Sequence, residues 1–131
     1  MKLNIETKEK IQAEYDAWQS EQYSGKDKKE RQKLGQFFTP PQLTIKMIEK
    51  FDSIKDKDIL DPTLGAGGLL AACILAGADP KRIYGIELDP DVLEVAKRRL
   101  GKLGVPSGNL ILGDALDPKS YEKLGRSTNE V

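Results

Sequence analysis

The sequence contains no histidine and only one cysteine, Cys73, among its 131 residues. The absence of histidine removes the commonest general base and the commonest transition-metal ligand, so we expect no metal site. A single cysteine cannot form an intramolecular disulfide, and Cys73 lies in an apolar run, which indicates a reducing, cytoplasmic setting. The chemistry of this chain must therefore come from other side chains.

Net charge is also absent, because 21 basic residues balance 21 acidic ones. A free-standing DNA-binding protein usually has a basic excess that neutralises phosphates, so the composition does not support DNA binding by this chain alone. No run approaches the roughly 18 apolar residues of a membrane span, and the N-terminus has no apolar signal segment. We expect one domain with one modest core and no membrane partner.

Residues 1–34 are highly charged, and we predict that they form an N-terminal helical arm. Four residues recur there at helical spacing: Ile11, Tyr15, Trp18 and Gln22. This spacing predicts a helix over residues 6–22, with Asn4 or Thr7 as its cap. The stretch 26–33 alternates in charge and is predicted to be a solvated helix or linker. Two alternatives remain open for the longer helix: it packs on the chain's own core, or it docks a partner.

From residue 35 to residue 131, short apolar strands alternate with helices. The predicted strands cover 58–61, 82–87 and 109–113. The predicted helices cover 40–51, 68–76, 90–100 and 118–124. This alternation is typical of a parallel α/β fold, in which right-handed crossovers place the strands in the order 3-2-1. The domain is therefore predicted to be half of a doubly wound, Rossmann-like sheet.

Two helix starts have recognisable signals. Thr39 is the predicted cap of helix 40–51, which has proline in its first turn. Asp89 is the predicted cap of helix 90–100. The predicted inner face of helix 40–51 carries four apolar residues: Leu43, Met47, Ile48 and Phe51.

Acidic residues stand at or beside the ends of all three predicted strands: Asp61, Glu87 and Asp114. Ligands of doubly wound sheets bind outside the carboxyl ends of the strands, so these side chains should face one crevice. Asp61 precedes a tight turn in which Gly65 and Gly67 let the backbone approach a ligand closely. Glu87 can accept both hydroxyls of a ribose, and Asp114 can accept from an adenine amine. Together these features predict an adenosine site.

Two details favour S-adenosylmethionine over a dinucleotide such as NAD in this site. The dinucleotide pattern requires a third glycine where this chain has Leu70. Asp61 also lies directly before the glycine turn, where it would repel a pyrophosphate but attract the amino group or sulfonium of a methionine moiety. An NAD-binding fragment is the weaker alternative.

Two motifs make a family resemblance specific. Residues 35–40 read GQFFTP before a helix, and residues 61–68 read DPTLGAGG. In this order the motifs resemble those of the N6-adenine DNA methyltransferases of restriction-modification systems, in particular the modification subunits of type I systems with the gamma motif order. The resemblance covers roughly residues 34–117 and implies an S-adenosylmethionine-dependent methyltransferase fold.

The resemblance implies ten cofactor-binding residues: Phe38, Thr39, Asp61, Pro62, Gly65, Gly67, Glu87, Leu88, Asp114 and Ala115. The two residues from the first motif would cover the methionine end of the cofactor. The second motif would hold its amino acid and sulfonium region. Glu87 would bind the ribose hydroxyls, with Leu88 against the adenine ring. Asp114 and Ala115 would contact the adenine edge.

The catalytic loop of that family, (N/D)PP(Y/F), does not occur in this sequence. In the family its first side chain and a proline carbonyl accept hydrogen bonds from the target amine, and its aromatic ring stacks on the flipped base. The only Pro-Pro pair here, Pro40-Pro41, belongs to the first motif, and Asn129 in the polar tail 126–131 is followed by Glu130. We therefore expect no catalytic residue in this chain, and DNA as a partner only within a larger enzyme.

Two functions fit these observations. The first is the S-adenosylmethionine-binding portion of a DNA adenine-N6 methyltransferase that cannot methylate alone. The second is a non-catalytic cofactor-binding or regulatory remnant that assembles with itself or another subunit. Ile59 and Leu60 would lie on an exposed sheet edge, because no fourth strand is predicted. We expect a second copy, the N-terminal helix, or a complementary methyltransferase or specificity subunit to cover that edge.

Overall fold

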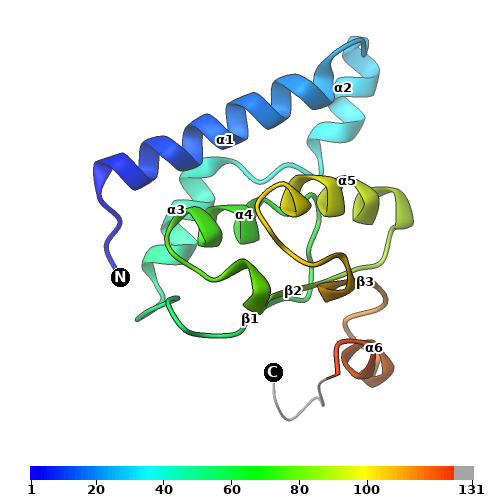
Figure 1. The fold of residues 1–131 in the computed structure, drawn as a ribbon. Helices are drawn as coiled ribbons and strands as arrows, with labels where there is room; N and C mark the ends of the chain where they lie inside the picture. The colour runs from blue at the N-terminus through cyan, green and yellow to red at the C-terminus, as the bar shows by residue number, and fades with distance from the viewer. Residues whose placement is uncertain (126–131) are drawn as a thin grey trace.

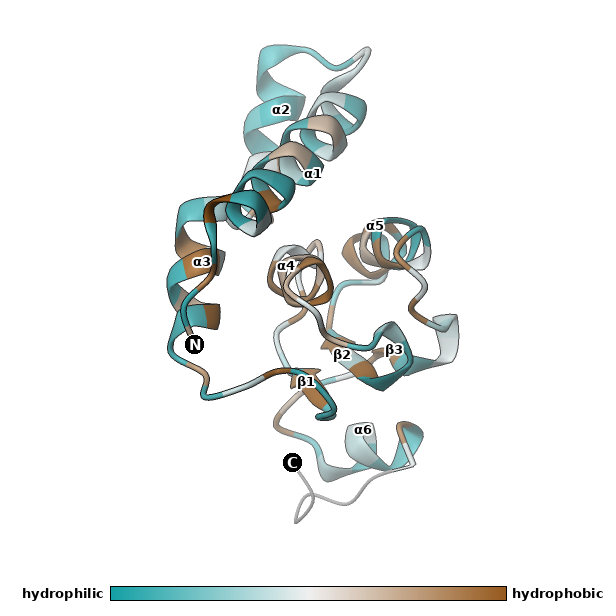
Figure 2. Ribbon diagram, turned by 60° about the vertical axis from the view of Figure 1, so that its left-hand side comes forward, coloured by the Kyte–Doolittle hydropathy of each residue, from teal (hydrophilic) through white to brown (hydrophobic). Residues whose placement is uncertain are grey.

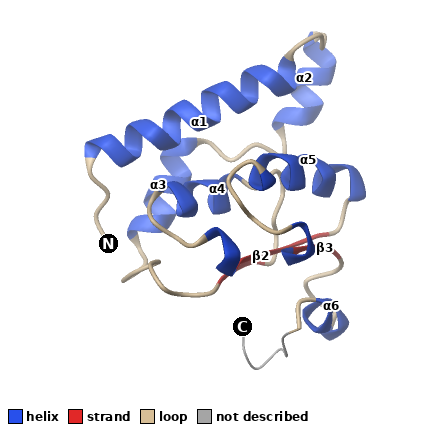
Figure 3. Cartoon of the chain, viewed as in Figure 1, coloured by secondary structure: helices blue, strands red, loops and turns tan. Residues whose placement is uncertain are grey.

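Three short parallel strands form one sheet in the computed structural model, which describes residues 1–125 (Figures 1 and 3). The strands are β1 (Ile59–Asp61), β2 (Ile83–Glu87) and β3 (Leu110–Leu112), in the order β1-β2-β3. The predicted α/β class and strand order are confirmed, although β3 is shorter than predicted at both ends. The predicted polar tail, with Asn129, lies outside the described residues.

Helices cover both faces of the sheet. They are α1 (Ile5–Tyr23), α2 (Lys28–Gly35), α3 (Pro41–Glu49), α4 (Gly68–Leu75), α5 (Pro90–Gly101) and α6 (Pro118–Lys123). Two 3₁₀ turns, Pro80–Arg82 and Ser107–Asn109, lead into β2 and β3. Helices α4 and α5 lie on one face of the sheet and α6 on the other (Figure 2). No helix within residues 1–125 is long and apolar enough to cross a membrane.

The hydrophobic core lies between the sheet and α4, a helix of small and apolar residues. Leu70, Ala71 and Cys73 of α4 are fully buried, and Ile83 and Leu110 join them from β2 and β3. Burial raises the pKa of the Cys73 thiol to about 12. This thiol therefore stays protonated and contributes to packing rather than to redox chemistry.

Side-chain caps set the starts of several helices. Asn4 accepts from the Thr7 amide and is thus the cap of α1, which decides between the two predicted candidates. Asp89 caps α5 as predicted, by accepting from two backbone amides of the first turn. Asp117 caps α6 in the same way, by accepting from one amide.

The predicted cap of α3 is wrong. Pro40, not Thr39, occupies the cap position, and no side chain caps the helix. Pro41 fills the first helical position with a φ suited to a helix and without an amide that needs an acceptor. The helix also ends at Glu49, earlier than predicted.

The predicted inner face of α3 is wrong as well, except at Ile48. Three of its four residues are between 37% and 49% exposed: Leu43, Met47 and Phe51. The buried residues of α3 are instead Pro41, Thr44 and Ile48. The helix packs on α4 and α1 through that side, which leaves an apolar stripe toward solvent.

The N-terminal arm packs on the chain's own core, one of the two alternatives for its helix. Helix α1 contacts α3 and α4 and crosses their outer side (Figure 1). Ile11, together with Leu3 before the helix, belongs to the central apolar cluster, and Trp18 is buried too.

A side chain at Gly85 in β2 is predicted to destabilise the fold. A Cβ there would lie 2.8 Å from Leu64 Cδ1, closer than van der Waals contact allows. Gly85→Ala should lower the free energy of unfolding by about 1–3 kcal/mol, the usual cost of overpacking. Gly101→Ala is the matched control, because nothing lies within 4 Å of that Cβ position. Urea unfolding measures both variants, and equal stability of Gly85→Ala and wild type would contradict the packing described.

Candidate functional site

The carboxyl ends of β1 and β2 carry Asp61 and Glu87 to the same end of the sheet. The third acid is displaced, because β3 ends at Leu112 and Asp114 follows in the next loop. The Gly113 amide donates to the Glu87 carbonyl oxygen at 2.9 Å, so this loop runs beside the end of β2. The loops that follow the three strands therefore lie together at the carboxyl end of the sheet, where such folds bind ligands.

The Glu87 carboxylate joins two of these loops. Its Oε1 accepts from the Gly65 amide at 2.8 Å, and its Oε2 accepts from the Asp89 amide at 2.9 Å. Each oxygen has two lone pairs, so each retains capacity for a ligand hydroxyl. The next residue, Leu88, is 72% exposed and offers an apolar surface at the same place.

The turn after β1 depends on glycine at two positions. Gly65 and Gly67 have φ of 56° and 85°, in the left-handed region that other residues avoid. Gly67 is also the cap residue of α4, and a Cβ there would lie 3.0 Å from Leu100 Cδ1. The Leu64 amide donates to the Ile86 carbonyl oxygen at 2.9 Å, which holds the start of the turn against β2.

Asp61 is only 9% exposed, although it ends an edge strand. Its Oδ1 accepts from the Thr63 amide at 3.0 Å and from the Thr63 hydroxyl at 3.3 Å, across the exposed Pro62. Burial raises the pKa of Asp61, the Thr63 bonds lower it, and the negative charge of Glu87 raises it further. A cation placed beside these two carboxylates would be attracted by both. Within residues 1–125 no cluster of His, Cys, Asp or Glu could hold a metal ion.

Helix α6 shapes the loop that carries Asp114 and Ala115. The Ser120 hydroxyl donates to the Asp114 carbonyl oxygen at 2.7 Å, and the Tyr121 hydroxyl donates to the Ala115 carbonyl oxygen at 2.8 Å. The Asp114 side chain is exposed, and its Oδ1 accepts from the Leu116 amide at 2.9 Å. Helix α6 thus fixes the backbone of this loop, while the Asp114 carboxylate remains exposed.

The GQFFTP segment lies against the glycine turn. A Cβ on Gly68 would lie 3.5 Å from the Thr39 Cβ, so the two motifs meet. The Phe38 ring, however, is engaged with α1: its centroid lies 4.4 Å from that of Trp18 and 5.4 Å from that of Tyr23. Phe38 is therefore held in an aromatic stack that the sequence motifs did not reveal.

A groove of about 420 Å³ borders this segment on the side of α2 and α5. Its lining residues are Lys26, Glu30, Lys33, Leu34, Phe37, Phe38, Ala66, Asp89, Asp91, Val92 and Val95. Of the ten predicted cofactor residues, only Phe38 lines it. The groove therefore adjoins the loops at the strand ends but does not include the other nine predicted residues.

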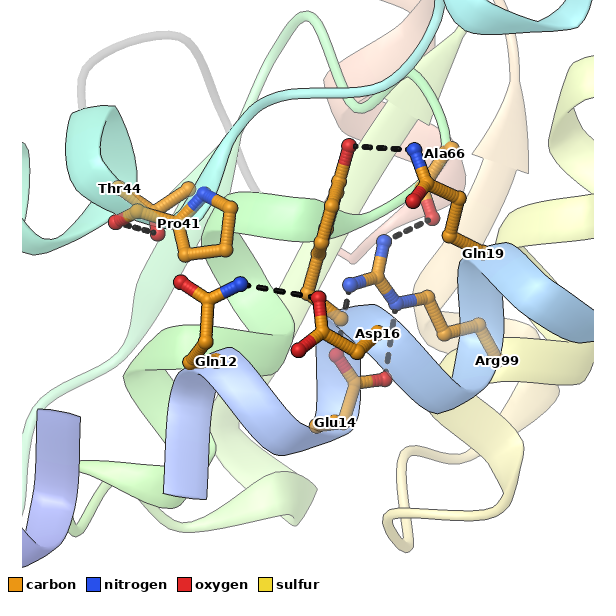
Figure 4. A network of polar contacts seen from close by, with 9 residues as sticks. Gln12, Glu14, Asp16, Gln19, Pro41, Thr44, Ala66 and Arg99 are labelled. Carbon is orange, nitrogen blue, oxygen red and sulfur yellow. Dashed lines mark hydrogen bonds and ion pairs between the residues drawn. The ribbon is translucent and has the colours of Figure 1, made fainter. Parts of the chain in front are cut away.

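Arg99 is a residue of this region that the sequence reasoning missed. Its side chain is 3% exposed, and its guanidinium donates to both Glu14 oxygens, at 2.6 Å and 3.0 Å (Figure 4). It also donates to the Ala66 carbonyl oxygen, in the glycine turn, at 3.5 Å. The available signal was its position beside Leu100 on the apolar stripe of α5, where a charge needs a buried partner.

The order of the strands and the loops at their ends are those of the Rossmann-like methyltransferases. The model of the family described as N-6 DNA Methylase matches residues 21–102, more than half of the chain. The chain therefore belongs to the N-6 DNA methylase family. No solved structure matches it.

Three curated relatives illustrate the similarity. The type II methyltransferase M.VspI of Vibrio sp. (strain 343) is 29% identical over 110 residues, which cover 82% of this chain and 25% of that protein. The type II methyltransferase M.CvrRI of Paramecium bursaria Chlorella virus XZ-6E is 36% identical over 70 residues, or 53% of this chain and 18% of that protein. A protein-L-isoaspartate O-methyltransferase of Pyrococcus horikoshii is 33% identical over 89 residues, or 66% and 40%. The chain thus spans less than half the length of these relatives.

Asp61→Asn is predicted to stabilise the ligand-free chain at neutral pH. Burial raises the pKa of the Asp61 carboxyl in the folded chain, so folding favours its neutral form. The carboxyl's contribution to stability is full below its unfolded pKa and is lost as the pH rises through the raised folded pKa. Asparagine stays neutral, and its amide oxygen can still accept from Thr63.

The melting temperature of Asp61→Asn at pH 7 should therefore exceed that of wild type. The difference should shrink as the pH is lowered into the titration range of the carboxyl. Thermal unfolding followed by circular dichroism across that range provides the measurement. A variant that melts below wild type at pH 7 would show that the charged form of Asp61 is favoured by folding.

Proposed function

We propose that this chain binds S-adenosylmethionine and serves as the cofactor-binding portion of a DNA adenine-N6 methyltransferase of restriction-modification type. The observation that carries this proposal is the Glu87 carboxylate, which bonds the Gly65 and Asp89 amides while it retains acceptor capacity. A carboxylate held so at the end of the second strand is suited to the two hydroxyls of a ribose.

The neighbouring residues fit the other parts of that cofactor. Asp61 and Glu87 together favour a positive charge, which the methionine moiety has in its amino group and its sulfonium. The exposed Leu88 offers an apolar contact for the adenine ring, and the accessible Asp114 carboxylate offers an acceptor for its amine. S-adenosylmethionine supplies an activated methyl group when it is bound.

Leu70 and Asp61 argue against NAD. The dinucleotide pattern has glycine where this chain has Leu70. The Leu70 side chain is fully buried in the core, so glycine there would leave a cavity, and the position is used for packing in this chain. The buried Asp61 at the glycine turn opposes a pyrophosphate. An NAD-binding fragment is therefore not the function that we propose.

The names of the relatives support a cofactor role for the matched region. Two are type II methyltransferases, whereas the third acts on protein isoaspartate according to its name. A segment that methyltransferases of different substrates share is more readily explained by a common cofactor than by a common substrate. The family membership is what directs the proposal to adenine in DNA.

Isothermal titration calorimetry should detect binding of S-adenosylmethionine and S-adenosylhomocysteine but not of NAD. Glu87→Ala and Asp61→Ala should each weaken binding by roughly 10- to 150-fold, since a bond to a charged group contributes about 1.5–3 kcal/mol. Asp79→Ala is the matched control, because this exposed acid caps a turn at the opposite end of the sheet. Absence of binding by the wild-type chain would refute the proposed function.

We also propose that another polypeptide or a second copy covers the β1 edge. In residues 1–125 β1 pairs with β2 alone, and α1 lies over α3 and α4 instead (Figure 1). A groove beside this edge is lined by four apolar residues, Phe51, Ile54, Ile59 and Leu60, together with Lys50, Asp52, Ser53, Lys57 and Asp58. Open strand edges are usual sites of association.

Two measurements test this arrangement. If a second copy covers the edge, size-exclusion chromatography with light scattering should show self-association that Leu60→Lys reduces, because a charge on the strand opposes pairing. The isolated chain should transfer no labelled methyl group to DNA, since the sequence lacks an (N/D)PP(Y/F) loop. A clean monomer with freely exchanging β1 amides would contradict self-association, and labelled DNA would contradict the dependence on another polypeptide.

A further inference from the structure

One buried side chain connects three separate parts of the chain. Arg99 extends from α5, pairs with Glu14 of α1, and donates to the Ala66 carbonyl oxygen between the two turn glycines (Figure 4). The Arg99 side chain is 3% exposed and that of Glu14 19% exposed, so this ion pair is largely shielded from solvent. The glycine turn is thereby tied to the N-terminal helix.

A second connection runs from Arg99 to the GQFFTP segment through aromatic rings. The Arg99 guanidinium lies 3.9 Å from the ring centroid of Trp18, within the range of cation–π attraction. The Trp18 ring also lies against Phe38, 4.4 Å away between centroids, and Phe38 in turn stacks on Tyr23. The rings form one contiguous aromatic group across α1 and the first motif, in which Trp18 is tilted by 57° to Phe38 and Tyr23 stacks on Phe38 at 24°.

Packing alone does not explain a tryptophan at position 18. Its indole N–H is buried without a hydrogen-bond acceptor among the described residues, an unfavourable state that phenylalanine would avoid. The larger indole face, however, is better suited than a phenyl ring to lie between a guanidinium and a second ring. We therefore infer that Trp18 serves to hold Arg99 and Phe38 in position, beyond filling space in the core.

We propose that Arg99, Trp18 and Glu14 are positioning residues for the cofactor site, and that α1 is a working part of that site. Arg99 holds the carbonyl between Gly65 and Gly67, while Trp18 holds Phe38 beside Thr39. The buried Arg99–Trp18 contact thus positions both motifs. This inference rests on the proposed function, because it concerns affinity for S-adenosylmethionine.

Helix α1 offers a closely matched pair of variants. Glu14 and Glu21 both pair with cations of α5, namely Arg99 and Lys102. The Lys102–Glu21 pair is 65% and 60% exposed, and the bonds of Lys102 do not reach the glycine turn. Glu14→Gln and Glu21→Gln therefore remove the same charge from the same helix, but only the first change loosens Arg99.

Calorimetry with S-adenosylmethionine should show that Glu14→Gln weakens binding by about three- to tenfold, the range typical of residues that act through others. Glu21→Gln should bind within about twofold of wild type, as expected for an exposed pair. Circular dichroism and thermal unfolding confirm that both variants are folded at the assay temperature. Equal affinities of folded Glu14→Gln and wild type would overturn the inference.

Fluorescence supplies a second readout that a purely structural role would not change. Trp18 is the only tryptophan in the chain, so excitation near its red edge reports on this stack alone. Saturating S-adenosylmethionine should shift or quench its emission, because Phe38, which packs against the indole, belongs to the motif proposed to cover the methionine end of the ligand. Trp18→Phe keeps an aromatic ring, removes the unpaired N–H, and should still weaken binding by about threefold or more.

The outcomes separate the two proposals. If the wild-type chain binds no S-adenosylmethionine, the proposed function fails and this inference fails with it. If wild type binds and folded Glu14→Gln binds equally well, only the inference is overturned. Weaker binding by both variants, with Glu21→Gln unchanged, supports α1 as part of the site.

Discussion

The Glu87 carboxylate bonds the amides of Gly65 and Asp89, and the geometry of the site depends on this pair of hydrogen bonds. One oxygen holds the glycine turn after β1, and the other holds the start of α5. Charge-assisted bonds of this kind are short and directional, so the two loops share one reference point. Buried Asp61 adds a second carboxylate nearby, which sets the local preference for a cation.

The sequence predicted those parts of the structure that local chemistry determines. Gly65 and Gly67 adopt positive φ, and Asp89 caps a helix, because these residue types suit those backbone positions. The exposed face of α3 was not predictable, since apolar residues occupy both sides of that helix and only its contact with α4 selects one. Arg99 was missed because most arginines on helices are solvated, and its partner Glu14 is distant in the sequence.

Membership of the N-6 DNA methylase family and the arrangement of the sheet agree on the kind of protein to which this chain is related. The residues of this chain provide only part of such an enzyme. They form the loops at the strand ends, the glycine turn, and helix α1, which Arg99 links to that turn. Phe38 illustrates the difference. The motif resemblance assigns it to the cofactor, whereas its ring lies against Trp18 and Tyr23, so it reaches a ligand only from within that stack.

We propose that the loops at the carboxyl ends of the strands bind S-adenosylmethionine. Titration of the ¹⁵N-labelled chain with S-adenosylhomocysteine, followed by amide chemical shifts, tests this binding. We expect the largest shifts at Gly65, Gly67 and Leu88, and none at Gly108, which precedes the amino end of β3. Unchanged spectra, or shifts centred away from the strand ends, would contradict it.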